Sequence, residues 1–138
     1  SIAASLAPDH EVVVIDIDPD RTEQLKYELD ALTITGDGTT SSVQRTAEVN
    51  KADMLIACTD NDQTNLVACG TAKTLGDVFT TARVGNTDFL RTWEGSEGAF
   101  GVDFMVCSDL LTAENIVRGI GLQTANDGEP IAGGHGQL

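Results

Sequence analysis

Positive charge is scarce in this chain, which has 138 residues but only three lysines and five arginines against 22 aspartates and glutamates. Its net charge of −14 at pH 7 opposes binding to nucleic acid and to anionic membrane surfaces. The regular apolar segments argue against disorder, which is the other common meaning of an acidic sequence. The excess of carboxylates favours a halophilic source. At molar salt the Debye length is about 3 Å, so the repulsion between the carboxylates is screened. An acidic protein from a mesophile is the alternative.

Long apolar runs and paired cysteines are also missing. No run of apolar residues is longer than five, whereas a membrane-spanning helix needs about 20. Cys58, Cys69 and Cys107 lie far apart, form no Cys-x-x-Cys pair and have no histidine nearby. This spacing argues against a metal site or a redox pair. We interpret the three residues as buried thiols of a cytosolic protein.

The residue combinations of common enzymes are absent as well. Tyr27 is the single tyrosine and has an alanine four residues on, so a Tyr-x-x-x-Lys dehydrogenase pair is impossible. His10 and His135 fall in a predicted loop and a predicted tail, where a general base is poorly placed. Asp60 and Asp62 form an acidic cluster without an evident apolar pocket, so we expect a solvated surface there. No catalytic residue and no metal ligand is therefore assigned.

What the chain does have is strand–helix alternation over nearly its whole length. We expect strands at residues 11–17, 31–35, 53–58, 78–84 and 102–106, and helices at 20–30, 40–48, 62–75, 87–94 and 109–120. Such alternation predicts an α/β fold with a doubly wound, right-handed parallel sheet. Residues 1–120 would form the domain. The glycine-rich residues 121–138 would be a linker or flexible tail.

The most informative segment is the β-branched run at residues 12–15, which ends in the carboxylate of Asp16. A strand that is apolar on both faces suits a parallel sheet covered by helices on each side. Asp18 and Pro19 then predict a helix start, as N-cap and first helical residue. Leu25, Leu29 and Leu32 would supply the buried face of the helix at 20–30.

Ligands of doubly wound sheets bind along the carboxyl ends of the strands. In this sequence those ends carry the candidate binding residues Asp16, Asp37, Gly38, Thr39, Thr59, Asp60 and Arg83. A carboxylate at the end of its strand suits ribose hydroxyls and would repel a 2′-phosphate. A guanidinium at another strand end suits a bidentate phosphate contact.

Each of these positions has a purely structural alternative. Asp18 is expected to cap a helix rather than to contact a ligand. Gly36 to Thr39 suit either a contact with adenine or a plain turn. Asn65 could hydrogen-bond either to a ligand or to the backbone of a loop. Arg83 suits either a phosphate or a structural ion pair.

A dinucleotide site also needs a Gly-x-Gly-x-x-Gly loop about 20 residues before its acid. Only 15 residues precede Asp16, and they contain no such loop. We therefore expect the loop upstream of Ser1, in a longer polypeptide; the alternative is that something else completes the fold.

Five segments together resemble one known family, the TrkA N-terminal (RCK/KTN) domain of potassium transport systems. They are EVVVIDIDPDR (11–21), ALTITGDGT (31–39), ADMLIACTDNDQTNLVAC (52–69), TTARVGN (80–86) and VDFMVCSDLLTAENIVRGI (102–120). The resemblance implies a Rossmann-like fold that lacks its first strand and glycine loop here. It also implies Asp16 at the ribose, residues 37–39 at the adenine, Thr59 and Asp60 in the central crevice, and Arg83 at phosphate.

The same resemblance implies a function. The chain would be a regulatory, non-catalytic subunit in the cytoplasm, at the inner face of the cell membrane. It would sense NAD(H) or ATP/ADP, gate a membrane potassium channel or transporter, and form a homodimer or larger ring through the helix at 109–120. An NAD-dependent oxidoreductase fragment lacking its substrate domain and a bare oligomerisation module are the alternatives.

Overall fold

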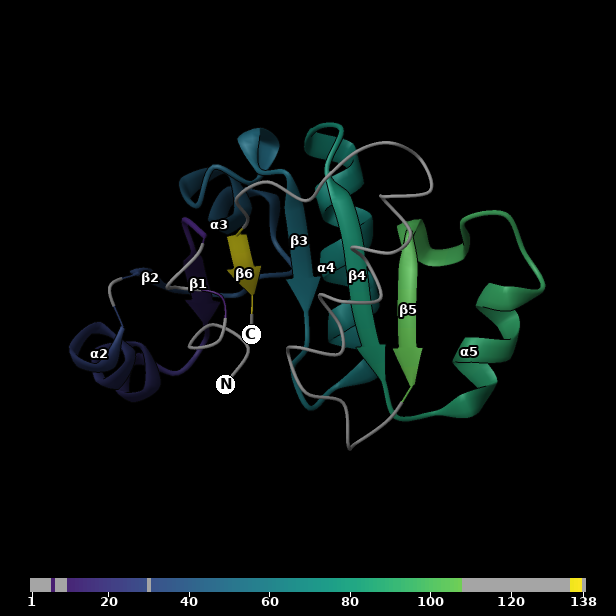
Figure 1. Ribbon diagram of the computed structural model, residues 1–138, viewed down its shortest axis with the longest axis horizontal. Helices are drawn as coiled ribbons and strands as arrows, with labels where there is room; N and C mark the ends of the chain where they lie inside the picture. The colour runs from purple at the N-terminus through teal and green to yellow at the C-terminus, as the bar shows by residue number, and fades with distance from the viewer. Residues whose placement is uncertain (1–5, 7–9, 30, 108–134, 138) are drawn as a thin grey trace.

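The computed structural model describes residue 6 and residues 10–29, 31–107 and 135–137 of the chain. In chain order, the elements are β1 (Val13–Asp16), α2 (Pro19–Glu28), β2 (Leu32–Thr35), α3 (Ser41–Thr46), η1 (Val49–Lys51), β3 (Met54–Ala57), α4 (Asp62–Leu75), β4 (Phe79–Val84), α5 (Thr87–Glu94), η2 (Ala99–Gly101), β5 (Phe104–Cys107) and β6 (His135–Gln137). The predicted α/β alternation is confirmed, with boundaries that differ by no more than one or two residues (Figure 1). The helix predicted at 109–120 lies outside the described residues. None of the described helices is both long and apolar enough to cross a bilayer.

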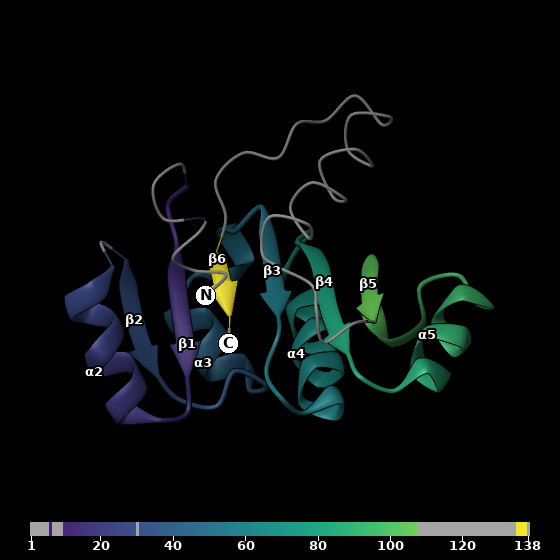
Figure 2. The same ribbon diagram turned by 60° about the horizontal axis from the view of Figure 1, so that its bottom comes forward.

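The strand order shows where the side on which successive strands are added to the sheet reverses. β1 pairs in parallel with β2, and a second group has the order β5–β4–β3–β6. From β1 the chain adds β2 on one side, and from β3 it adds β4 and then β5 on the other side (Figure 2). This reversal is the switch point at which open α/β sheets bind ligands, next to the carboxyl ends of their strands.

The strand of the second group that lies next to β1 is β6. It pairs in parallel with β3, with His135 opposite Leu55, and it lies beside β1 in both ribbon views. No ladder joins β1 and β6, so the described strands form two separate sheets. The sequence predicts a linker or tail for residues 121–138, whereas 135–137, the part of that range that the structure describes, form this strand. A backbone ladder needs no particular side chain, so a glycine-rich segment without apolar periodicity can supply one.

The apolar run of β1 is buried on both faces, as the sequence predicts. Val14 packs in a cluster with Leu25 of α2. Ile15 packs on the opposite face, in a larger cluster that includes Leu66 of α4. Successive side chains of a strand point to opposite faces of the sheet. The side chains of this run therefore pack alternately against helices on one face and on the other. The prediction for Leu32 is wrong, because it lies in the edge strand β2 and its side chain is 61% exposed.

The helices α2, α3, α4 and α5 each begin at a polar capping side chain. Asp18 Oδ1 accepts a hydrogen bond of 2.9 Å from the backbone N–H of Asp20, and Pro19 is the first helical residue, which confirms the predicted helix start. Thr40, Asn61 and Asn86 cap α3, α4 and α5 in the same way. These caps fix where the chain turns from each strand into the next helix. They therefore shape the loops at the switch point.

Candidate functional site

The loops that follow β1, β2 and β3 enclose a pocket of about 550 Å³ at the switch point. It is lined by Asp16, Ile17, Asp18, Arg21, Gly36, Asp37, Gly38, Cys58, Thr59, Asp60, Asn61 and Thr64. Five of the seven sequence-predicted binding residues are in this lining; Thr39 and Arg83 are not. The volume falls within the range of small-molecule sites. The lining also includes the N-cap and one first-turn residue of both α2 and α4, where helix N-termini favour negative charge.

Asp16 closes the end of β1, with only 5% of its surface exposed. Its Oδ1 accepts a hydrogen bond of 2.9 Å from the backbone N–H of Asp18. Its Oδ2 accepts one of 3.1 Å from Nη1 of Arg21, whose side chain is 58% exposed. The carboxylate is therefore held in one orientation by a backbone group and by a guanidinium that is free to move into solvent. Such an acceptor suits the hydroxyl groups of a sugar.

The loop after β2 is a turn organised by Asp37. Its Oδ1 accepts hydrogen bonds from the backbone N–H of Thr39 at 3.0 Å and from the Thr39 hydroxyl at 2.7 Å. These two bonds lower the pKa of Asp37 below its ordinary value of 3.8. Asp37 and Gly38 line the pocket, whereas Thr39 acts on it through Asp37 and donates no group of its own to the lining. The lowered pKa moves Asp37 away from the neutral range that general base catalysis uses.

Gly36 brings the same loop close to α3. A Cβ at this position would lie 2.8 Å from Cγ2 of Val43, which is closer than such contacts allow. The close approach explains why a glycine opens this turn, although its backbone conformation does not require one.

The loop after β3 is held by Asn65, which is completely buried. Asn65 Oδ1 accepts from the backbone N–H of Thr59 at 2.9 Å and from its hydroxyl at 2.6 Å. Asn65 Nδ2 donates to the carbonyls of Thr59 at 3.1 Å and Arg83 at 2.7 Å. Of the two alternatives for Asn65, the structure shows the bond to loop backbone. The side chain thus joins the ends of β3 and β4 to the start of α4.

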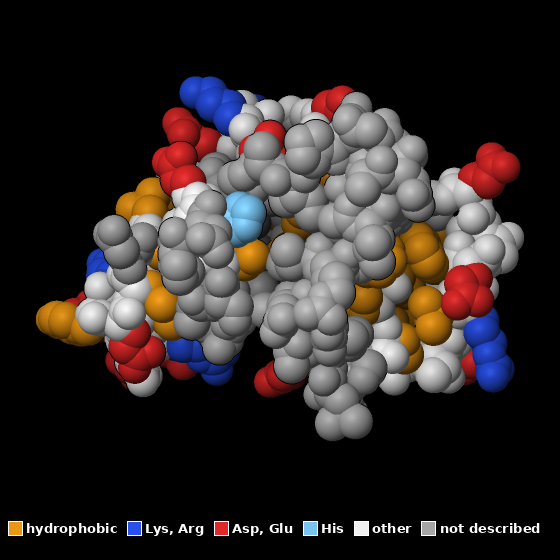
Figure 3. Space-filling view, in the orientation of Figure 1, with side chains coloured by type: hydrophobic (Ala, Val, Ile, Leu, Met, Phe, Trp, Pro, Cys, Tyr) orange, Lys and Arg blue, Asp and Glu red, His pale blue; other side chains and the backbone are white. Residues whose placement is uncertain are grey.

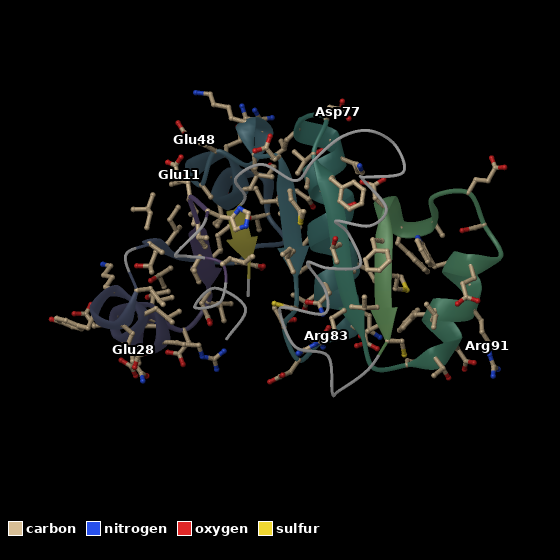
Figure 4. The ribbon with its side chains drawn as sticks, in the orientation of Figure 1. Glu11, Glu28, Glu48, Asp77, Arg83 and Arg91 are labelled. Carbon is tan, nitrogen blue, oxygen red and sulfur yellow. The ribbon has the colours of Figure 1, made fainter. Side chains whose placement is uncertain are left out.

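Arg83 lies at the carboxyl end of β4, at the lower end of the strands in Figure 4. Its Nη2 donates to the Thr59 carbonyl at 3.0 Å and lies 3.6 Å from Oδ1 of Asp60. The Asp60 side chain is fully exposed, whereas that of Arg83 is 30% exposed. Arg83 therefore supports the loop after β3 in this structure, which corresponds to the structural ion pair among the two alternatives. Burial raises the pKa of the neighbouring Cys58 to about 11, and the charge of Arg83 opposes part of that rise.

Three residues near the pocket were not found from the sequence. Arg21 pairs with Asp16 across the strand–helix turn, a spacing that no simple motif records. Ile17 lines the pocket with an apolar side chain that is 71% exposed, and alternation along the strand could have indicated it. Asp62 is half-buried, and its carboxylate accepts exposed hydrogen bonds from the backbone N–H groups of Gly85 at 2.9 Å and Asn86 at 3.0 Å, a role that the sequence did not indicate.

The lining suits one part of a nucleotide better than another. A buried carboxylate, an exposed apolar side chain and a turn of small residues can contact a ribose and a flat base. The sequence contains no Gly-x-Gly-x-x-Gly loop to bind a pyrophosphate. Within the described residues there is no group of three His, Cys, Asp or Glu side chains arranged to hold a metal ion.

Parallel strands with helices on both faces and a pocket at the switch point define a Rossmann-like α/β domain. The model of the TrkA-N domain family matches residues 1–107. The chain belongs to this family, and the resemblance seen in its sequence is confirmed.

Curated relatives agree with this assignment. The chain is 35% identical over 133 residues to a "Trk system potassium uptake protein TrkA homolog" of Archaeoglobus fulgidus, covering 96% of this chain and 30% of that protein. It is 36% identical over 140 residues to "Trk system potassium uptake protein trkA homolog 1" of Methanosarcina mazei, covering 96% and 34%. The chain thus spans about a third of the length of these relatives.

Solved structures show the same fold. The structure titled "GsuK channel bound to NAD" superposes with a TM-score of 0.63 at 22% identity, covering 76% of this chain and 18% of that one. The TrkA-N domain of the inner membrane protein ybaL from Escherichia coli superposes with a TM-score of 0.61 at 15% identity, covering 84% and 96%.

Proposed function

We propose that this chain is a non-catalytic, nucleotide-sensing domain that regulates a potassium uptake system. The observation that carries the proposal is the buried carboxylate of Asp16 at the end of β1, inside a pocket at the switch point of a TrkA-N fold. Relatives named as potassium uptake proteins support the biological setting. Similar folds titled as bound to NAD and to ADP support the ligand class, NAD(H) or ATP/ADP.

The proposed contacts follow the three loops. Asp16 would accept hydrogen bonds from the ribose hydroxyls, with Arg21 moving aside because its side chain is largely exposed. Asp37, Gly38 and Thr39 would lie on the adenine side, where Thr39 positions the carboxylate of Asp37.

The central crevice and the phosphate side complete the proposal. Thr59 and Asp60 would face the middle of the ligand. Arg83 would exchange its contact with Asp60 for a phosphate, since that ion pair is 3.6 Å long and its carboxylate is fully exposed. An exposed pair of this kind contributes little stability and is readily exchanged.

The membrane-associated role rests on the family. Ligand binding would shift a two-state homodimer or ring, built through residues 109–120, and thereby gate a potassium channel or transporter at the cytoplasmic face of the membrane. Residues 109–120 lie outside the described structure.

Calorimetric titration of NADH, NAD, ATP and ADP into the chain in molar KCl tests the proposal. Saturable binding of at least one of them, without turnover, is the expected result. If none binds to the chain or to a version extended upstream by the glycine loop, the sensor proposal fails. Oxidation of an added hydroxyl substrate with NAD would instead favour the dehydrogenase alternative.

Replacing Asp16 by alanine should weaken binding of any ribose-containing ligand by about 1–3 kcal/mol, the scale of lost hydrogen bonds to a charged group. Asp20→Ala is the matched control, because Asp20 lies in the first turn of α2 and does not line the pocket. Circular dichroism checks that both variants fold. Equal affinity of the Asp16 variant and the parent chain would show that the ribose binds elsewhere.

A further inference from the structure

Among the described residues, the two guanidinium groups beside the pocket are already paired with carboxylates. Arg21 contacts Asp16 at 3.1 Å, and Arg83 lies 3.6 Å from Asp60. The lining contains four carboxylates in all, since Asp18 and Asp37 also belong to it. Four carboxylates against two guanidinium groups leave the pocket negative.

The rest of the chain has the same sign, with a net charge of −14. On the face shown in Figure 3, described Asp and Glu side chains lie at several separate places along the outline, and the described Lys and Arg side chains do not gather into one basic patch. An anionic ligand therefore approaches the pocket against repulsion from the site itself and from the whole domain. Dissolved salt shortens the range of this repulsion, from about 10 Å at 0.1 M to about 3 Å at 1 M.

We propose that salt concentration controls ligand binding at this pocket, so that affinity for anionic nucleotides rises with ionic strength. The proposal rests on the proposed function, in which a nucleotide occupies the pocket. The domain would then report nucleotide and salt together. A phosphate site built from unpaired Lys and Arg shows the opposite dependence.

The size of the effect follows from the charge. A sphere with this net charge and a radius of about 18 Å repels a single negative charge at its surface less strongly as salt rises. Between 0.1 M and 1 M salt the affinity should rise about threefold for each negative charge on the ligand. NAD, with a net charge of about −1, should gain about threefold, and ADP, at about −3, more than tenfold.

Affinities of adenosine, NAD and ADP for the 138-residue chain, measured at 0.1, 0.3 and 1 M KCl, test this inference. Adenosine is uncharged and shares every effect of salt on folding and on apolar contacts, so the ratio of the other affinities to its own isolates charge. A rise graded from NAD to ADP supports the inference. Flat or falling ratios overturn it while leaving the proposed function intact. No binding of any of the three at any salt, either to this chain or to the version extended upstream by the glycine loop, overturns both.

Two further comparisons separate screening from other causes. KCl, NaCl and choline chloride should act equally at equal ionic strength, and an effect confined to KCl would overturn screening in favour of a specific cation. Asp60→Asn should tighten ADP binding at 0.1 M KCl several-fold more than Asp77→Asn. Asp77 is an exposed residue at the opposite end of the strands from Arg83 (Figure 4), and both variants change the net charge equally. Equal effects of the two would overturn the assignment to the pocket.

Discussion

Replacing Asn65 by alanine tests whether one buried amide holds the pocket together. Asn65 makes four hydrogen bonds, three to Thr59 and one to the Arg83 carbonyl, from a side chain with no exposed surface. Alanine removes all four and leaves the backbone N–H of Thr59 and two carbonyl groups without these partners. The loop after β3 would then lose its attachment to α4 and to the end of β4.

The expected loss of unfolding free energy is about 2–4 kcal/mol, because each buried bond contributes about 1 kcal/mol net and an abandoned buried partner costs more. Water can reach Thr59, which is half-buried, and this keeps the value below the sum for four fully buried bonds. Asn65→Asp is a second informative change. It keeps the acceptor for Thr59 but places a carboxylate oxygen where the amide donates to two carbonyls, so it should also destabilise the fold.

Urea unfolding followed by circular dichroism measures these changes. Two other asparagines serve as graded controls. Asn61→Ala should lower the free energy of unfolding by about 1 kcal/mol, because it removes the N-cap of α4. Asn50→Ala, at an exposed residue of η1, should lower it by less than about 0.5 kcal/mol. An Asn65→Ala variant within about 0.5 kcal/mol of the parent would refute the role assigned to this network.

The remaining predictions concern packing and titration. Gly36→Ala should cost about 1–2 kcal/mol of unfolding free energy in urea, and a second change, Val43→Ala, should recover most of it by removing the atom 2.8 Å from the new Cβ; no recovery would mean that the strain lies in the backbone. The raised pKa of Cys58, about 11, predicts slow alkylation at pH 8, read by peptide mass spectrometry. The neutral Cys58 thiol should contribute its full stability below pH 9, and this contribution should decline as the pH rises towards 11. A Cys58→Ala variant whose free energy of unfolding falls as much over this pH range as that of the parent chain would contradict this. Because the pKa of Asp37 is lowered in the folded state, its ionised carboxylate stabilises the fold at pH values above 3.8, the ordinary pKa. This contribution is lost as the pH falls through the lower pKa of the folded state. Thr39→Val removes the hydroxyl bond and keeps the backbone bond, so it should return the pKa of Asp37 part of the way towards 3.8 in an NMR titration. An unchanged pKa would show that the Thr39 hydroxyl is not a cause.

Local chemistry made much of the fold predictable. The cap at Asp18, the proline at the first turn of α2 and the two-faced run before Asp16 act within a few residues, and the structure confirms all three. Leu32 was misjudged because its exposure depends on β2 being an edge strand, which is a property of the whole sheet.

The site was less predictable, because its polar contacts connect distant segments. The bonds from Asp62 to the loop after β4 cross more than 20 positions in the sequence, and a pair of acidic residues indicates nothing about them. The bond from Asn65 to Arg83 is of the same kind. The strand β6 carries no apolar pattern, so only its place in the sheet reveals it. The roles of the candidate binding residues towards a ligand stay predictions.

The missing ladder between β1 and β6 has a mechanical consequence. The loops after β1 and β2 belong to one sheet, the loop after β3 belongs to the other, and the pocket opens between them. The two halves are therefore connected near the pocket by side chains and loops rather than by strand hydrogen bonds. A ligand held at once by Asp16 and Thr59 would connect the two sheets and limit their movement relative to each other.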